Sequence, residues 1–181
     1  MIKRQLIFIC AVWGCLIMFS CNSDYIIRQK GYFKIDFPQH RYQVFNDPEY
    51  PYSFEYPLYA TVVKDTTFFE DKPESPYWIN IDFPSFNGKI YLSYKDLRKN
   101  EFSRLVDDAF KLTYKHSAKA TAIRDSMIHT PTGLGGIFFK VGGNAATGRQ
   151  FFITDSTKHF LRGALYFDAT PNADSLNVVN D

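Results

Sequence analysis

The first 21 residues constrain this chain most, because they carry the pattern of an export signal. Lys3 and Arg4 form a positive start, an unbroken apolar run covers residues 6–19, and Ser20 and Cys21 follow. A membrane-spanning helix needs about 20 apolar residues, so this run is short for a permanent anchor. A charged head, a short apolar core and a small residue are typical of a secretory signal. The sequence therefore predicts a signal peptide over residues 1–20.

The cysteine directly after the small residue makes this a bacterial lipoprotein signal. Cleavage before Cys21 leaves its thiol and its new amino group to carry the acyl chains, so Cys21 is the predicted lipidation site. Two alternatives stay open. Cys15 also follows a small residue, Gly14, although cleavage there leaves residues 16–19 as an apolar stub. The other is an uncleaved signal anchor.

The chain without its signal has the length of one domain. Residues 21–181 suit a single hydrophobic core. Residues 21–50 contain few aliphatic side chains, and three prolines fall within 38–51. We therefore predict a membrane-proximal tether and extended arm over residues 21–50, and a globular domain over residues 51–181.

Charge and cysteine content exclude several classes of function. The chain has 21 basic and 19 acidic residues, and Lys3 and Arg4 lie in the signal, so the remainder holds 19 of each. A neutral surface argues against nucleic acid as a partner, because such proteins are strongly basic. All three cysteines lie within the signal and its cleavage site. The mature domain is thus expected to have no disulfide, no thiol nucleophile and no cysteine metal site.

Most of the mature chain reads as β-strand. Alternating or β-branched and aromatic segments predict strands at 32–37, 53–56, 59–69, 77–83, 89–94, 121–129, 137–141, 151–155 and 160–167. Asn87-Gly88 is a strong signal for a hairpin. The tetrapeptide Ile-Asp-Phe-Pro occurs at 35–38 and 81–84, which indicates two similar strand ends and no repeat architecture.

Two helices are expected. Asn100 is a candidate cap for an amphipathic helix of roughly 18 residues, whose apolar positions recur at spacings of 3 and 4 from Phe102 to Thr113. Pro171 and Asp174 indicate the start of a short C-terminal helix. The predicted fold class is therefore α+β: a single domain whose mostly antiparallel β-sheet is covered by one long amphipathic helix and a short C-terminal helix.

Several segments that resemble catalytic or cofactor motifs have simpler interpretations. Residues 143–148 resemble a phosphate loop, but Arg149-Gln150 replaces the required Lys-Ser/Thr and a strand follows, so turn glycines are expected. The histidines at 40, 116, 129 and 159 lack metal-ligand spacing. Asp155, Ser156 and His159 suit a triad only if the fold assembles them; otherwise they form a polar turn between two strands. We predict no catalytic residue, no cofactor and no metal, and therefore no enzyme.

The aromatic residues of the N-terminal half have two interpretations. They can line a ligand groove or partner surface, or they can fill the core of a sheet, and strands favour the second. The set comprises Tyr32, Phe33, Tyr50, Tyr52, Phe54, Tyr56, Tyr59, Tyr77 and Trp78.

Several blocks resemble the gliding-motility lipoprotein GldD family of Bacteroidetes. They are residues 31–38 with 42–43, residues 51–57, the helical segment 108–116, and the longest block, 142–156 with 159–167. The resemblance covers nearly the whole mature chain. The C-terminal end is shorter than the family pattern, so an incomplete terminal helix is expected.

This resemblance implies a place in the envelope machinery for surface gliding, which is associated with type IX secretion. The implied partners are the membrane, reached through the lipid anchor, and other gliding or secretion proteins of the envelope, with the domain in the periplasm. Cys21 is the one functional position that transfers. The resemblance leaves two hypotheses open: a non-enzymatic interaction or assembly factor, and a module that binds a small or glycan ligand or hydrolyses it at a site without a motif.

Overall fold

The computed structural model describes residues 35–66 and 74–180. The chain divides into two compact units, 1–35 and 36–181, and the fold described here is that of the second. The predicted signal peptide, with Cys15, the predicted lipidation site Cys21, and residues 22–34 lie outside the described residues. No helix in the described ranges is long and apolar enough to cross a membrane.

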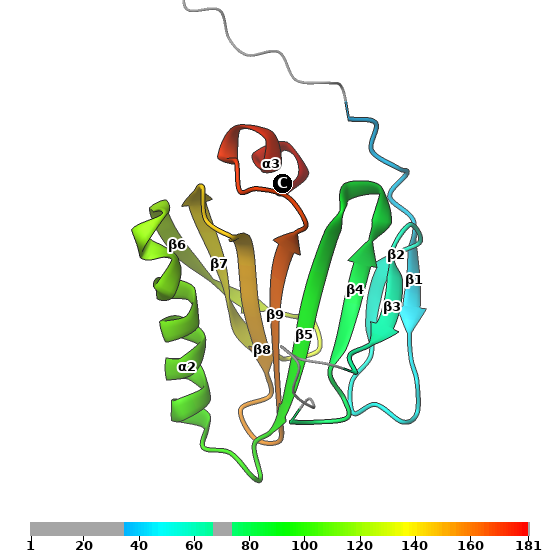
Figure 1. Cartoon of the computed structure of the whole chain (residues 1–181). Coiled ribbons are helices and arrows are strands. Elements are labelled where there is room, and N and C mark those ends of the chain that lie inside the picture. The colour runs from blue at the N-terminus through cyan, green and yellow to red at the C-terminus, as the bar shows by residue number, and fades with distance from the viewer. Residues whose placement is uncertain (1–34, 67–73, 181) are drawn as a thin grey trace, which may run out of the picture. The chain divides into compact units, whose positions relative to one another are not determined.

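The unit is built on an antiparallel sheet, in agreement with the predicted α+β class (Figure 1). Its seven described strands follow the order β3-β4-β5-β9-β8-β7-β6. Their bounds are β3 Thr61–Lys64, β4 Ile79–Phe83, β5 Gly88–Asp96, β6 Ala120–His129, β7 Gly135–Gly143, β8 Thr147–Thr154 and β9 His159–Phe167. A separate antiparallel pair consists of β1 (Tyr42–Phe45) and β2 (Phe54–Pro57).

Neighbouring strand residues point to opposite faces of a sheet, and this places the two cores. Phe151 and Leu161 belong to one core, with Ile79, Ile81 and aromatic side chains around β1 and β2. Their neighbours Phe152 and Phe160 belong to the other core, beneath α2 (Phe102–Tyr114). The β1–β2 pair and α2 therefore cover opposite faces of the sheet.

The aromatic residues are mostly core, as the strand interpretation predicted. Tyr50, Tyr52, Phe54 and Tyr56 pack against the first core, and Trp78 is buried. The rings of Phe45 and Phe54 stack with their centroids 5.0 Å apart. Tyr32 and Phe33 lie outside the described residues.

The long helix is amphipathic as predicted, but its expected start is wrong. It begins at Phe102, and Glu101 occupies the cap position without a side-chain hydrogen bond to the helix. The Asn100 amide instead donates to the Asp96 carbonyl 2.9 Å away, so it closes the turn after β5. The helix continues as a 3-10 turn, Lys115–Ala118, and a second helix, α3, spans Ala173–Asn180.

The two Ile-Asp-Phe-Pro segments differ in structure. The second ends β4, and the 3-10 turn Pro84–Phe86 leads to Asn87, whose left-handed φ of 48° completes the predicted β4–β5 hairpin. In the first, residues 35–38 have no regular secondary structure, so the expected strand end there is wrong. Residues 42–45, further along the same segment, form β1.

Candidate functional site

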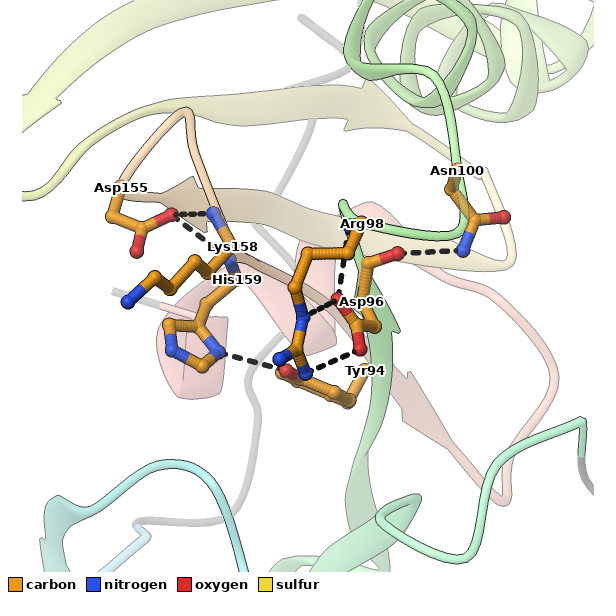
Figure 2. A network of polar contacts seen from close by, with 7 residues as sticks. All are labelled: Tyr94, Asp96, Arg98, Asn100, Asp155, Lys158 and His159. Atoms are coloured by element: carbon orange, nitrogen blue, oxygen red, sulfur yellow. Dashed lines mark hydrogen bonds and ion pairs between the residues drawn. The ribbon is translucent and has the colours of Figure 1, made fainter.

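A polar cleft opens at the end of the sheet where β5 stops and β9 begins (Figure 2). It has a volume of about 770 Å³. Its lining combines aromatic rings with several ionisable groups, which include Tyr77, Tyr94, Lys95, Asp96, Arg98 and His159. Asp96 and His159 are paired residues of the β5–β9 ladder, so the antiparallel register itself brings these side chains together.

The centre of the cleft is a hydrogen bond between Tyr94 and His159. The Tyr94 hydroxyl lies 2.7 Å from Nδ1 of His159. The Tyr94 ring is buried, and Tyr77 meets it edge-on at a centroid distance of 5.5 Å. Burial, helped by the charge of Asp96, raises the pKa of the Tyr94 hydroxyl, so this phenol stays protonated at neutral pH.

Asp96 is already held by its own neighbour. Arg98 donates to it three times: its backbone N–H and Nε each lie 2.9 Å from Oδ1, and Nη2 lies 2.7 Å from Oδ2. The side-chain hydrogen bonds from Arg98, followed by its backbone N–H, lower the pKa of Asp96 to about 2. The carboxylate is therefore ionised and saturated, which suits a fixed recognition group better than a proton carrier.

Lys95 brings a partly desolvated cation to the same wall. Its ammonium forms an ion pair with Glu74 and lies 5.5 Å from the ring centroid of Trp78. The Trp78 indole in turn donates to the Tyr94 carbonyl at 3.0 Å. Burial lowers the pKa of Lys95, against a smaller opposing effect of Asp108. Ring, cation and carbonyl thus fix one another on adjoining strands.

The Asp155, Ser156 and His159 arrangement is a turn and not a triad. Oδ1 of Asp155 accepts the backbone N–H groups of Thr157, Lys158 and His159 at 3.0, 2.8 and 2.8 Å. Ser156 has a left-handed φ of 61°, and its N–H donates to Thr154 Oγ1. Within the described ranges no hydrogen bond joins the Ser156 hydroxyl to the imidazole, which is used by Tyr94. The polar-turn interpretation is confirmed.

The glycine-rich segment also behaves as a turn. It joins β7 to β8, which begins at Thr147, so a strand and not a helix follows the glycines. The first N–H of α3, that of Ala173, is bonded to Oδ1 of Asn144 in this segment at 2.9 Å. Gly143 has a φ of +86°, and a Cβ there would lie 2.7 Å from the backbone nitrogen of Thr121. Glycine is needed because the chain turns in a left-handed conformation against β6.

The four histidines lie in four different places. His40 borders a second, apolar pocket, His116 lies in the 3-10 turn after α2, and His129 ends β6. Burial lowers the pKa of His116, and the nearby charge of Arg162 lowers it further. Across residues 35–66 and 74–180, no three His, Cys, Asp or Glu side chains are grouped to hold a metal ion.

No motif in the sequence predicts the cleft, although one local signal is present. A mostly polar run, Asp96-Leu97-Arg98-Lys99-Asn100, follows a predicted strand. In an Asx turn an Asp side chain accepts the backbone N–H of the residue two positions later, and Asp96 precedes Arg98 by two. The contacts that complete the cleft join residues 65 positions apart, Tyr94 and His159. Such pairs depend on strand register, which the sequence does not reveal.

Fold and cleft together define an α+β domain of one main antiparallel sheet with a polar cleft at one strand end. The sequence model of the gliding motility lipoprotein GldD family matches residues 22–181, and the chain belongs to this family. Membership associates the chain with gliding motility and with the cell envelope.

Other comparisons add little. No curated protein matches the chain. Among solved structures, the solution structure of cyanobacterial PsbP (CyanoP) from Synechocystis sp. PCC 6803 is similar, with 13% sequence identity and a TM-score of 0.46. The similarity covers 85% of this chain and 91% of that one.

Proposed function

We propose that this chain is an envelope lipoprotein, anchored through Cys21, that serves as a non-enzymatic component or assembly factor of the gliding machinery associated with type IX secretion. The observation that carries the proposal is the family match over residues 22–181, directly after the lipoprotein signal and Cys21. The anchor confines the domain to a membrane surface, which raises its effective concentration near other anchored components. We place the domain in the periplasm, with gliding and secretion proteins of the envelope as partners.

The state of the cleft favours recognition over chemistry. Asp96 is saturated by Arg98, and Asp155 by three backbone N–H groups. His159 is engaged by Tyr94. A general acid or base needs a pKa near the working pH, and both carboxylates have pKa values held well below that. These groups form a fixed polar surface that a partner can recognise.

The alternative is a module that binds a small or glycan ligand, or hydrolyses it at a site without a motif. The cleft supports this hypothesis, because it is about 770 Å³ and its lining includes Tyr77 together with Lys95, Asp96 and Asn100. Rings next to charged and amide groups suit sugars, which present both apolar faces and hydroxyls. Retention of defined envelope glycans by the wild-type protein, and its loss in Tyr77→Ala, would favour this alternative.

The anchor is tested with two cysteine variants. Cys21→Ala should accumulate as an unprocessed precursor, fail to incorporate a palmitate analogue, and abolish gliding although the domain still folds. Cys15→Ala is the matched control and should be labelled, processed and functional. Gliding and export through the associated secretion system are scored at matched protein levels. Normal labelling and cleavage of Cys21→Ala would refute lipidation at this position.

A further inference from the structure

A second pocket lies at the other end of the sheet from the polar cleft. It has a volume of about 230 Å³ and is lined by residues of the β4–β5 hairpin, the end of β9 and α3. These elements are at the top of Figure 1. Its main wall is aromatic and aliphatic: Phe37, Tyr59, Phe83, Phe86, Leu165 and Phe167. On β5 the pocket is lined by Gly88 and Ile90 and the cleft by residues 94–96, so the two sites lie at opposite ends of a strand about 25 Å long.

The Ile-Asp-Phe-Pro segments both contribute to this pocket. Phe37 comes from the first segment and Phe83 from the second. The rings are already packed: Phe37 and Phe86 lie 5.6 Å apart between centroids, and Tyr59 lies 6.1 Å from Phe83. The wall is thus a pre-formed cluster of rings, so ligand binding does not lose free energy in ordering these side chains.

The lining is mostly apolar and suits a hydrocarbon better than a charged ligand. It contains no Lys, Arg, Asp or Glu, and its polar side-chain groups are those of His40, Tyr59 and Asn180. Apolar cavities of about 150 Å³ stay dry and take up molecules such as benzene, so this larger pocket accommodates a longer piece of hydrocarbon. The apolar character extends outward, because Phe37 is 49% exposed and Val178, next to Val179 of the lining, is 54% exposed.

Phe37, which lines this pocket, stands only two positions after the first described residue, Ile35. Residues 22–36 separate Cys21 from Phe37, and a chain of that length spans at most about 55 Å when fully extended. If Cys21 is lipidated, as the proposed function requires, the pocket always lies within that reach of the membrane. An exposed aromatic pocket so tethered meets acyl chains at high local concentration.

We propose that this apolar pocket binds the terminal part of a lipid acyl chain. The chain comes either from the lipid on Cys21 itself or from a neighbouring phospholipid, and the chemistry recognised is the same. Occupancy holds the β4–β5 end of the domain at the bilayer and leaves the polar cleft, at the far end of β5, turned toward the periplasm. The proposal rests on the lipid anchor of the proposed function.

The test uses the full lipoprotein in phosphatidylcholine nanodiscs that contain a phosphatidylcholine with a diazirine on its acyl chain. After irradiation and digestion, adducts are mapped by mass spectrometry. A diazirine near the methyl end should label the peptides of Phe83, Phe86 and Phe167, whereas one next to the carboxyl should not. Equal labelling by both positions would show surface collision alone and overturn the proposal.

A filled pocket provides the second measurement. Val179→Trp places an indole in the lining, and Val178→Trp makes the same change on the exposed neighbouring position of α3. Each buried methylene changes affinity about fourfold, so loss of two methylenes from the pocket should lower pocket adducts by roughly tenfold or more. Val178→Trp should keep wild-type labelling. Undiminished adducts in a folded Val179→Trp protein would refute the site. If this variant does not fold, the comparison of the two diazirine positions in the wild-type protein decides whether the pocket binds the acyl chain.

The source of the chain is found in a second preparation. Cells are fed the diazirine fatty acid, so that Cys21 carries it, and the purified protein enters unlabelled nanodiscs. Pocket adducts from either preparation support the proposal; their absence from both overturns it. Intact mass reports lipidation separately. A lipidated protein without pocket adducts refutes the pocket alone, whereas a protein without lipid refutes the anchor and leaves the phospholipid preparation to decide on the pocket.

Discussion

The Tyr94 hydroxyl and Nδ1 of His159 lie 2.7 Å apart, a hydrogen bond that joins β5 to β9 at the floor of the polar cleft. The backbone carbonyl of the same tyrosine accepts the indole N–H of Trp78, the residue directly before β4. One residue therefore ties three strands at the point where the cleft is built. The bond between Tyr94 and His159 fixes the strand side of the cleft, whose remaining lining comes from the turns around residues 51, 74–77 and 98–100.

Tyr94→Phe tests the hydrogen bond while it keeps the buried ring. The variant should lose about 1 kcal/mol of unfolding free energy, the net value of a typical hydrogen bond, because only the hydroxyl is removed. Tyr91→Phe is the matched control: the same strand carries it, its side chain is 39% exposed, and it should change stability by less than about 0.5 kcal/mol. Urea unfolding measures both. Equal losses in the two variants would contradict a structural role for the bond.

Asp155→Asn tests the turn that carries His159, and its effect depends on pH. Burial alone would raise the pKa of Asp155, but the N–H groups of His159, Lys158 and Thr157 together outweigh it and hold the pKa well below the ordinary 3.8. A carboxyl with a lowered pKa in the folded state stabilises above its unfolded pKa and loses that contribution as pH falls.

At pH 7 the unfolding free energy of the wild type should exceed that of Asp155→Asn by about 1 kcal/mol. The expected difference is kept this small because solvent screens the charge of this partly exposed group. The difference should shrink progressively as the pH drops below about 4. Urea unfolding at pH 7 and at successive values below 4 checks this. A difference that stays constant over that range would show that the charge of Asp155 contributes nothing.

Much of the fold follows from the sequence because its signals are local. Asn87-Gly88 predicts its hairpin through the left-handed conformation that Asn tolerates, and the spacing from Phe102 to Thr113 predicts the covering helix. Asn100 shows the limit of such signals. A residue suited to cap a helix was taken by a nearer acceptor, the Asp96 carbonyl, and α2 begins one residue later without a side-chain cap.

The cleft is a different case, because no local pattern specifies it. Asp96 and His159 face each other only through the β5–β9 register, and a shift by one residue would turn either side chain to the other face. The same holds for the apolar pocket, which unites Phe37, Phe83 and Phe167 from three distant segments. The repeated Ile-Asp-Phe-Pro was visible in the sequence, but its convergence on one pocket was not.

Gly136→Ala tests how closely β7 and β8 pack. A Cβ at Gly136 would lie 2.0 Å from the backbone oxygen of Phe152, and a strand backbone cannot yield as a side chain does. The variant should lose about 3 kcal/mol or more. Gly135→Ala, where a Cβ meets nothing within 4 Å, should change stability by about 0.5 kcal/mol or less. Thermal unfolding of the pair decides, and similar melting temperatures would contradict the strand pairing described here.

Single histidine substitutions test the non-enzymatic proposal directly. The four histidines, His40, His116, His129 and His159, lie apart. Nδ1 of His159 is already hydrogen-bonded to the Tyr94 hydroxyl. Enzymes that use histidine as a general base commonly lose 10²-fold or more in rate without it, whereas a recognition surface spreads its energy over many contacts. Each histidine→Gln variant should therefore keep gliding near the wild-type level when the protein amount is matched.

His159→Gln is the most demanding of the four, since it also removes the bond to Tyr94 and should cost about 1 kcal/mol of stability. Comparison with Tyr94→Phe separates the two effects, because both variants lose the same bond and only one loses the imidazole. Similar gliding in both variants supports a structural role for His159. A His159→Gln protein that is folded, anchored and without gliding, beside a functional Tyr94→Phe protein, would assign chemistry to the imidazole and overturn the non-enzymatic proposal.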